Sequence, residues 1–292
     1  MDQPWESISG KRILITGGTG GIGLAAAAAM AAMGGRVSIV ARHQRRAESA
    51  VAQIAAAGRP GMTVDVLTAD LSSLAEVRRL AADALERYPR IDVLINNAGA
   101  LYMNRQVSAD GLEMTFALNH LAPFLLTTLL LDRLRASQPA RIITTSSAAH
   151  RGARIPWDDM GAEHHYRGFG RYGQSKLANI LFTQELARQL AGSGVTANCF
   201  HPGFVATGFG RNNGGLTRMA IGLLKPFGRR PAEGADTLIW LADAPEAGAY
   251  TGQYFVDRRP TQPDGPDRDG GAARRLWAWS SEAVKAKREP EG

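Results

Sequence analysis

A tyrosine and a lysine, Tyr172 and Lys176, stand four residues apart in a stretch that reads as a helix. Positions i and i+4 lie on one helix face, so the spacing brings the phenol and the ammonium group together. A free tyrosine, with a pKa of ~10, transfers protons poorly at neutral pH. A cation within ~4–6 Å favours the phenolate and lowers that pKa by ~1–3 units. We therefore expect Tyr172 to exchange a proton with a substrate, assisted by Lys176.

A glycine-dense turn, residues 16–23 (TGGTGGIG), separates an apolar run from an Ala-rich segment. It fits three patterns at once: Gly18-x-Gly20-x-x-Gly23, Gly17-x-x-Gly20-x-x-Gly23 and Thr16-Gly17-x-x-x-Gly21-x-Gly23. Glycines between a strand and a helix let a pyrophosphate approach the N–H groups at the helix N-terminus. The turn therefore predicts a dinucleotide site, and the alternative is a tight strand–helix turn without a ligand.

The end of the second apolar run reads Ala41-Arg42-His43. A site for NAD would place Asp or Glu about 20 residues after the glycines, to hold the ribose 2′-OH. Here no acid would repel a phosphate, and the planar guanidinium of Arg42 suits one. The sequence therefore predicts NADP(H) as the cofactor, and the alternative is that Arg42 is only a surface cation.

Short apolar runs alternate with helical segments along the chain. The runs predict strands at 11–16, 36–41, 62–68, 91–95, 141–145, 195–200 and 253–256. Helices are expected at 24–33, 45–57, 73–88, 109–135, 172–190 and 231–242. This alternation predicts an α/β fold, a single-domain Rossmann-type doubly wound sheet of about seven parallel strands with helices on both faces. The strands are continuously apolar, as strands buried on both faces should be.

Size and composition narrow the class of protein. The 292 residues are 45% apolar and suffice for a buried core, and we expect one domain over 1–257. Residues 258–292 change to a polar loop, followed by an amphipathic helix and a mobile tail. The single cysteine, Cys199, excludes an intramolecular disulfide framework and a multi-cysteine zinc site. We expect no metal.

Charge and hydropathy bear on partners and location. The net charge of +7 has no nucleic-acid-binding motif behind it, so we expect no nucleic acid partner. The most apolar stretch, 121–131, is shorter than the ~20 residues that span a bilayer, and the N-terminus does not read as a signal peptide. We therefore expect a cytoplasmic protein without a transmembrane segment.

Short motifs occur along the chain in a fixed order, most of them at the ends of successive predicted strands. They are Thr16-Gly17-x-x-x-Gly21-x-Gly23, Asp70-Leu71, Asn96-Asn97-Ala98-Gly99, Asn119, Ser146-Ser147, Tyr172-x-x-x-Lys176 and Pro202-Gly203. In this order they resemble the short-chain dehydrogenase/reductase family over residues 10–257. The SSAAH run at 146–150, the long insert before Tyr172, and the SKLAN and LWAWS runs resemble its retinol-dehydrogenase-like subgroup.

The resemblance implies an NADP(H)-dependent oxidoreductase that transfers hydride between nicotinamide and a carbonyl or alcohol group of a lipophilic small molecule. By this resemblance Tyr172 donates the proton, Lys176 holds the nicotinamide ribose, Ser147 orients the carbonyl oxygen and Asn119 orders a water. Ser146 is the alternative serine, and Asn119 is alternatively a helix cap or a kink. Cofactor contacts are implied at Gly17, Thr19, Gly20, Gly21, Ile22, Gly23, Arg42, Asp70, Leu71, Asn97, Ala98, Gly99, Tyr172, Lys176, Pro202, Gly203, Val205 and Thr207.

Two inserts, 151–168 and 204–230, are expected to form an apolar substrate pocket. The resemblance also implies a homodimer or homotetramer in which the helices at 109–135 and 172–190 pair across a two-fold axis. The competing hypothesis is a non-catalytic binding protein that senses NADP(H). The complete set of motifs favours an enzyme.

Overall fold

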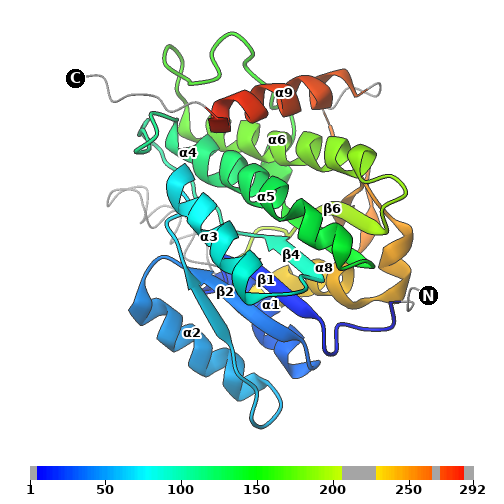
Figure 1. Cartoon of the computed structure of the whole chain (residues 1–292). Helices are drawn as coiled ribbons and strands as arrows, with labels where there is room; N and C mark the ends of the chain where they lie inside the picture. Colours follow the sequence, from blue (N-terminus) through cyan, green and yellow to red (C-terminus); the bar gives the residue numbers. More distant parts are fainter. Residues whose placement is uncertain (1–4, 206–227, 265–269, 286–292) are drawn as a thin grey trace.

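The computed structural model describes residues 5–205, 228–264 and 270–285. Within these ranges one sheet of eight strands runs through the molecule, in the order β3-β2-β1-β4-β5-β6-β7-β8 (Figure 1). Its strands are β1 (Arg12–Thr16), β2 (Arg36–Ala41), β3 (Asp65–Thr68), β4 (Val93–Asn96), β5 (Ala140–Thr145), β6 (Val195–His201), β7 (Tyr254–Val256) and β8 (Arg259–Pro260). Every neighbouring pair is parallel except β7 and β8. The doubly wound fold is confirmed.

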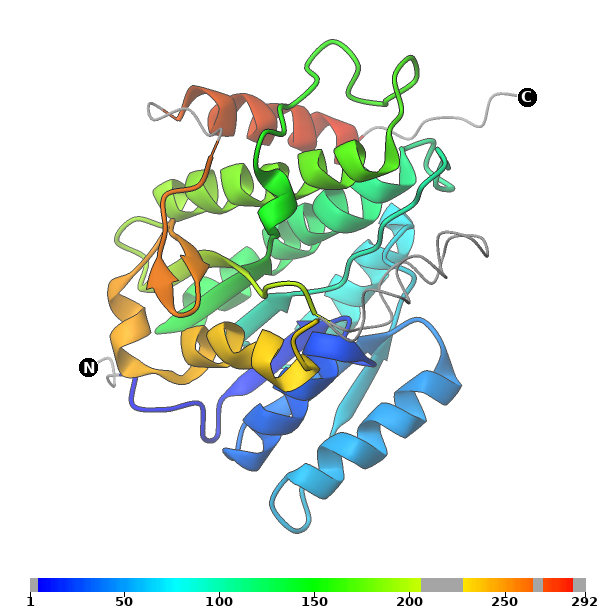
Figure 2. The same ribbon diagram turned by 180° about the vertical axis from the view of Figure 1, so that it is seen from behind.

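The strand count differs from the expected seven parallel strands by one. The additional strand, β8, is antiparallel and forms a hairpin with β7 at the edge of the sheet (Figure 2). It lies inside the segment that we expected to be a polar loop. The sequence gives no strand signal there, because Arg259 and Pro260 are exposed and form only a two-residue edge strand.

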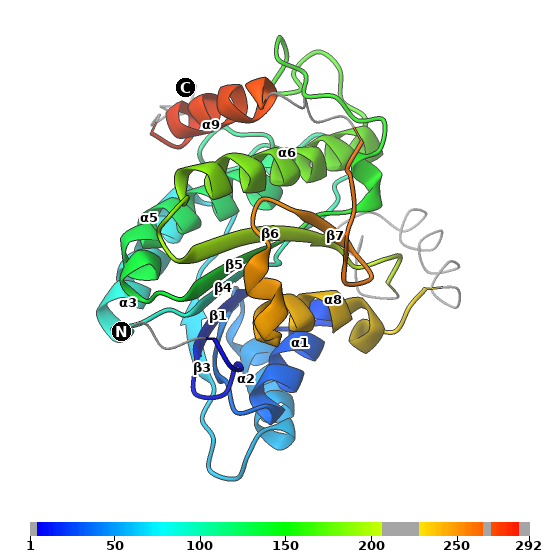
Figure 3. The same cartoon turned by 90° about the vertical axis from the view of Figure 1, so that its right-hand side faces the viewer.

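Helices cover both faces of the sheet in layers (Figure 3). One face carries α1 (Gly21–Ala32), α2 (Gln44–Ala57) and α8 (Pro231–Asp243). The other carries α3 (Leu74–Arg87), α5 (Ala122–Ala136) and α6 (Gly168–Gln189), and α9 (Gly271–Lys285) lies outside α6. Short turns complete the described chain: α4 (Met114–Phe116), the π-helical turn η1 (Ala117–Leu121), and the 3₁₀ turns η2 (Ala148–His150) and η4 (Pro245–Ala249).

The central strands are apolar at every position because both of their faces are covered. In β1, Ile13 and Ile15 pack into the cluster under α1 and α8, whereas Leu14 packs into the cluster under α3, α5 and α6. All three side chains are fully buried. Each such side chain contributes roughly 1.5–3 kcal/mol of hydrophobic stabilisation. The two clusters hold the strands in place between the helix layers, so the carboxyl ends of the strands can position the site residues.

Two expected helices differ from the structure by four residues or more at their N-terminal ends. The segment predicted as one helix at 109–135 contains α4, η1 and α5, so its axis is interrupted by a π-turn. The helix predicted from Tyr172 begins four residues earlier, at Gly168. A Cβ on Gly168 would lie 2.6 Å from the Tyr102 carbonyl oxygen, so this glycine lets the start of α6 pack closely against the preceding loop.

Helix α9 covers part of the surface of α5 and α6. The Trp277 ring lies 4.9 Å from the ring of Phe124 on α5 and 5.9 Å from that of Phe182 on α6. Trp279 lies edge-on to Phe116, with 5.7 Å between the ring centroids. This surface is therefore occupied within one chain, although it belongs to the helices at which we expected pairing across a two-fold axis.

The described chain contains one helical run, Met114–Ala136, that is long and apolar enough to cross a membrane by length and composition. Its mean hydropathy is 1.5, and 78% of its most apolar window is buried inside the fold. The apolar side chains of this run therefore pack in the core between the sheet and α9.

Candidate active site

The glycine turn after β1 forms an open cradle at the N-terminus of α1. Gly17 and Gly21 have φ angles of +70° and +55°, a conformation that glycine adopts without strain. A Cβ on Gly23 would lie 2.3 Å from the Gly17 carbonyl oxygen, whereas one on Gly20 would meet nothing within 4 Å. No side chain caps α1, and its first turn carries no acid. The free N–H groups and the helix dipole therefore fit a pyrophosphate, with Thr19 and Ile22 partly buried in the same turn.

Asn97 joins the ends of three strands beside this cradle. Its backbone N–H donates to Thr16 Oγ1 at 2.9 Å and its Nδ2 donates to the Thr16 carbonyl at 3.2 Å. Its Oδ1 accepts from Thr145 Oγ1 at 3.3 Å, and the Ala98 N–H shares Thr16 Oγ1. The ends of β1, β4 and β5 are thus fixed together at the point where the strand order reverses, which is where α/β sheets bind their ligands.

Tyr172 and Lys176 lie together on α6, as the spacing predicts. The Lys176 Nζ is 5.5 Å from the centroid of the Tyr172 ring and donates to the Thr145 carbonyl at 3.1 Å. Burial lowers the pKa of Lys176 to about 8. Burial also raises the pKa of Tyr172 to about 12, although a hydrogen bond with Ser147 opposes this shift. The pKa of Tyr172 is therefore raised and not lowered as expected, because burial of the phenol dominates, and the stabilisation of the phenolate by Lys176 stays a prediction.

The structure distinguishes the two serines after β5. The Ser146 hydroxyl is buried and donates to the Lys176 backbone carbonyl at 2.8 Å. The Ser147 hydroxyl accepts from the Ala149 N–H at 3.2 Å and forms the hydrogen bond with Tyr172. Ser147 is therefore the serine placed to share a substrate oxygen with Tyr172.

Asn119 lies in η1 and is fully buried. Its Oδ1 accepts from the Ala100 N–H at 2.8 Å, and its Nδ2 donates to the Ala100 carbonyl at 2.9 Å and to Ser175 Oγ at 3.0 Å. A Cβ on Gly99 would lie 3.1 Å from Asn119 Oδ1 and 3.4 Å from Lys176 Nζ, so both side chains face this glycine. Asn119 is not a helix cap. It marks a π-turn, a feature that is frequent at functional sites, and its water-ordering role stays a prediction.

Arg42 and Asp70 face each other at the carboxyl ends of β2 and β3. The Arg42 guanidinium lies 3.9 Å from the Asp70 carboxylate, and both side chains are about half exposed. Partial burial opposes ionisation of Asp70, but hydrogen bonds from Ser72 and the charge of Arg42 lower its pKa. Leu71 packs partly into the core. Such a distant, exposed pair leaves Arg42 able to contact another anion.

Pro202, Gly203 and Val205 follow β6 on the other side of the site. Gly203 has a φ of +82°, and a Cβ there would lie 2.8 Å from Cδ of Arg229, a residue that the sequence did not indicate. The Arg229 guanidinium pairs with Asp257 at 2.6 Å. Thr207 and most of the insert 204–230 lie outside the described residues.

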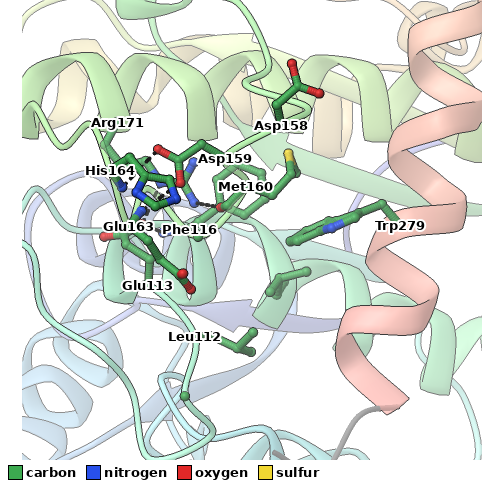
Figure 4. A pocket seen from close by; sticks show the side chains of 13 residues that line it. Leu112, Glu113, Phe116, Asp158, Asp159, Met160, Glu163, His164, Arg171 and Trp279 are labelled. Atoms are coloured by element: carbon green, nitrogen blue, oxygen red, sulfur yellow. Dashed lines mark hydrogen bonds and ion pairs between the residues drawn. The ribbon is translucent and has the colours of Figure 1, made fainter.

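A cavity of about 260 Å³ lies beside the start of α6 (Figure 4). The insert after η2 lines it with Asp159 and Met160, and Trp279 of α9 closes one side. Arg171 and Phe116 also line it, whereas Tyr172 does not. The insert and α9 therefore enclose space next to the catalytic helix. Within the described residues no group of three His, Cys, Asp or Glu side chains could hold a metal ion.

Comparison with known proteins decides the family. Residues 11–214 match the family model described as short chain dehydrogenase. The chain belongs to the short-chain dehydrogenase family. Retinol dehydrogenase 14 from Homo sapiens is 41% identical over 289 residues, which cover 92% of this chain and 84% of that protein. A candidate daunorubicin C-13 ketoreductase from Streptomyces sp. (strain C5) is 42% identical over 282 residues, covering 96% of this chain and 95% of that protein.

Solved structures show the same short-chain dehydrogenase fold. An uncharacterised protein from Mycobacterium paratuberculosis has a TM-score of 0.75 at 30% identity, over 98% of this chain and 99% of that one. RhlG from Pseudomonas aeruginosa, in a complex with NADP, has a TM-score of 0.68 at 30% identity, over 87% and 96% of the two chains. Together with the curated relatives, these matches identify a retinol-dehydrogenase-like oxidoreductase that acts on alcohol or carbonyl groups.

Proposed function

We propose that this short-chain dehydrogenase is an NADP(H)-dependent carbonyl reductase or alcohol dehydrogenase for a lipophilic small molecule. The observation that carries the proposal is the meeting of Tyr172, Lys176 and Ser147 beside the open glycine turn. When bound, the cofactor supplies the hydride. Tyr172 protonates the substrate oxygen, Ser147 donates a hydrogen bond to the charge developing there, and the Lys176 ammonium stabilises the phenolate that remains. The raised pKa of Tyr172 keeps the phenol protonated before reduction.

The preference for NADP(H) is supported by Arg42, whose exposed guanidinium stands where an NAD site has an acid. We expect Arg42→Ala to weaken NADPH binding by about tenfold or more, since a charge-assisted hydrogen bond contributes roughly 1.5–3 kcal/mol. NADH binding should change by less than about twofold, because NADH has no 2′-phosphate to pair with the guanidinium. Arg46→Ala, an exposed cation on α2, is the matched control. Equal losses of NADPH and NADH affinity would refute the phosphate contact.

A lipophilic substrate is supported by two exposed aromatic side chains. Phe169 precedes Tyr172 by one helical turn and is 60% exposed, and Phe204 follows β6 and is 52% exposed. The names of two relatives contain retinol and daunorubicin, of which the first is a largely apolar polyene and the second carries a fused ring system. A cytoplasmic location belongs to the same proposal, because the single, buried cysteine suits a reducing compartment.

The proposed function is tested by following NADPH oxidation with a panel of carbonyls from short aldehydes to long-chain aldehydes, retinal and polycyclic ketones. We expect turnover on a lipophilic member and none with Tyr172→Phe, whose NADPH affinity should stay close to that of the parent. Tight NADPH binding without turnover on any member would instead indicate a protein that senses the cofactor.

A further inference from the structure

A line of buried polar side chains connects α9 with the catalytic lysine. His120 follows Asn119 in η1, and its Nε2 lies 2.9 Å from Ser280 Oγ on α9. Its Nδ1 lies 3.4 Å from Asn179 Oδ1 on α6. Asn179 Nδ2 in turn donates to the Thr145 carbonyl at 3.2 Å, the same oxygen that accepts from Lys176 Nζ. Thr145 is 8% exposed, and every other residue of this line is at most 4% exposed.

The direction of each hydrogen bond follows from its fixed end. The Thr145 carbonyl can only accept, so Asn179 presents its NH₂ group there and its oxygen to His120. His120 must then carry its proton on Nδ1, which leaves Nε2 to accept from the Ser280 hydroxyl. All donors therefore point from α9 toward Thr145, and bonds aligned in this way polarise and strengthen one another.

The surroundings keep His120 neutral. The rings of Phe116, Phe124 and Phe182 lie 5.0, 6.3 and 6.2 Å from the imidazole. Burial lowers the pKa of His120 to about 3, the bond to Asn179 opposes this, and the charge of Arg171 adds to the lowering. A neutral imidazole carries its proton on only one of its two nitrogens. The hydrogen-bond partners of the ring therefore decide which nitrogen carries the proton.

We propose that His120, Asn179 and Ser280 are positioning residues that fix the Thr145 carbonyl and, through it, the ammonium group of Lys176. The inference rests on the proposed function in that the lysine's task is the proposed proton transfer. Asn179 shares the carbonyl with Lys176, His120 orients the Asn179 amide, and the Ser280 hydroxyl holds the imidazole by donating to its Nε2. Ser280 on the last described helix thus takes part in the geometry of Ser147, Tyr172 and Lys176, which lie more than a hundred positions earlier.

Loss of the Ser280 hydroxyl should weaken the line at its α9 end. The Thr145 carbonyl still requires the NH₂ group of Asn179, so His120 keeps its proton on Nδ1 and its buried Nε2 is left without a donor. The imidazole is then held from one side only, which loosens its bond to Asn179 and, through the shared Thr145 carbonyl, the position of Lys176 Nζ. The substitution itself removes one oxygen atom and no packing.

The first experiment tests the line of hydrogen bonds by NMR and needs no substrate turnover. Histidine ¹⁵N NMR on the full chain should show His120, assigned with His120→Asn, as the neutral Nδ1–H tautomer. In Ser280→Ala the unprotonated Nε2 should move to the chemical shift of a nitrogen that accepts no hydrogen bond. Ser281→Ala is the control, since the Ser281 hydroxyl bonds only within α9, to the Trp277 carbonyl at 2.9 Å. With ¹³Cε-lysine, the pKa of Lys176 should fall by about half to one unit in Ser280→Ala, because its ammonium loses a fixed acceptor.

The second experiment follows alcohol oxidation with NADP⁺ as a function of pH. The rising limb of kcat should move to higher pH by about half to one unit in Ser280→Ala and His120→Leu, since a displaced ammonium stabilises the phenolate less. His120→Asn, which can still donate to Asn179, should restore part of the shift. An Nε2–H tautomer in the parent, or profiles of Ser280→Ala and Ser281→Ala that coincide, would overturn the proposal. Absence of turnover in the parent would count against the proposed function, whereas the tautomer and the Lys176 pKa would still decide about the line.

Discussion

A buried ion pair anchors the start of the catalytic helix. Arg171 Nε lies 2.6 Å from Glu113 Oε2, and the two side chains are 2% and 0% exposed. Glu113 also accepts from the N–H groups of Thr115 and Phe116, at 2.8 and 3.0 Å, so its carboxylate caps α4. Arg171 immediately precedes Tyr172, and the pair therefore joins the catalytic helix to the segment that leads into η1.

We expect Glu113→Gln to lower the free energy of unfolding by about 3–5 kcal/mol, because it leaves the Arg171 charge buried without a counter-charge. The glutamine keeps the size of the side chain and one capping acceptor, so little of this loss comes from packing. Arg171→Met should cost about as much, since it leaves the Glu113 carboxylate unpaired. The double variant should cost less than the sum of the two by about 1–3 kcal/mol, since neither charge is then left alone.

Urea unfolding at pH 7 measures these changes in the free energy of unfolding. With a slope near ~3 kcal/mol/M, each single variant should unfold about 1–2 M earlier than the parent. Lys285→Met is the control, because both side chains of the Lys285–Glu282 pair are exposed, at 68% and 76%, and exposed pairs contribute about 0–1 kcal/mol. Single variants of the buried pair that unfold within about 0.5 M of this control would refute the reasoning about uncompensated charge, since that margin is about 1.5 kcal/mol at this slope.

Three further predictions concern the cofactor turn, α9 and acid stability. Gly23→Ala should unfold at a much lower urea concentration, because its Cβ would stand 2.3 Å from a carbonyl oxygen, whereas Gly20→Ala should keep the stability and lose NADPH affinity in a binding titration. Trp277→Ala should lower the free energy of unfolding by about 2–4 kcal/mol, and an unchanged urea midpoint would show that α9 packs weakly. The pKa values of His120 and His201 are lowered to about 3 and about 4, mainly by burial, so the unfolded chain binds more protons than the native one below pH 6.5. Stability should therefore fall as the pH drops from 6.5 toward 4, by up to about 1.4 kcal/mol per unit for each group, and His120→Asn should flatten this slope in urea titrations at several pH values.

Much of the fold could be predicted from local patterns. The apolar runs mark β1, β2 and β4 because strands buried on both faces admit few polar residues. The start of β3 could not be read in this way: the run at 62–68 has apolar residues from its first position, but pairing begins only at Asp65, opposite Ser38 of β2. Sheet edges such as β8 depend on their partners more than on their own residues.

The site residues also divide into those that local spacing predicts and those that depend on distant parts of the chain. The spacing of Tyr172 and Lys176 is local, so the sequence predicts their contact, and the structure agrees. The pKa of Tyr172 depends on burial by distant elements, and here a rule about neighbouring charges gave the wrong direction. His120 carried no signal of its own, because a single histidine among apolar residues is most often a core residue. Its partner Ser280 lies 160 positions away, and only the folded chain brings the two together.

The place of α9 in the chain has a consequence for biosynthesis. A ribosome completes the glycine turn, the sheet and the catalytic helix before it makes any residue of α9. During that interval Phe124 and Phe182 lack the tryptophan that covers them, and His120 has no hydroxyl at Nε2. The Ser280 end of the line of hydrogen bonds can therefore form only after α9, the last described helix, has been made, whereas the glycine turn and the helix of Tyr172 and Lys176 precede it in synthesis.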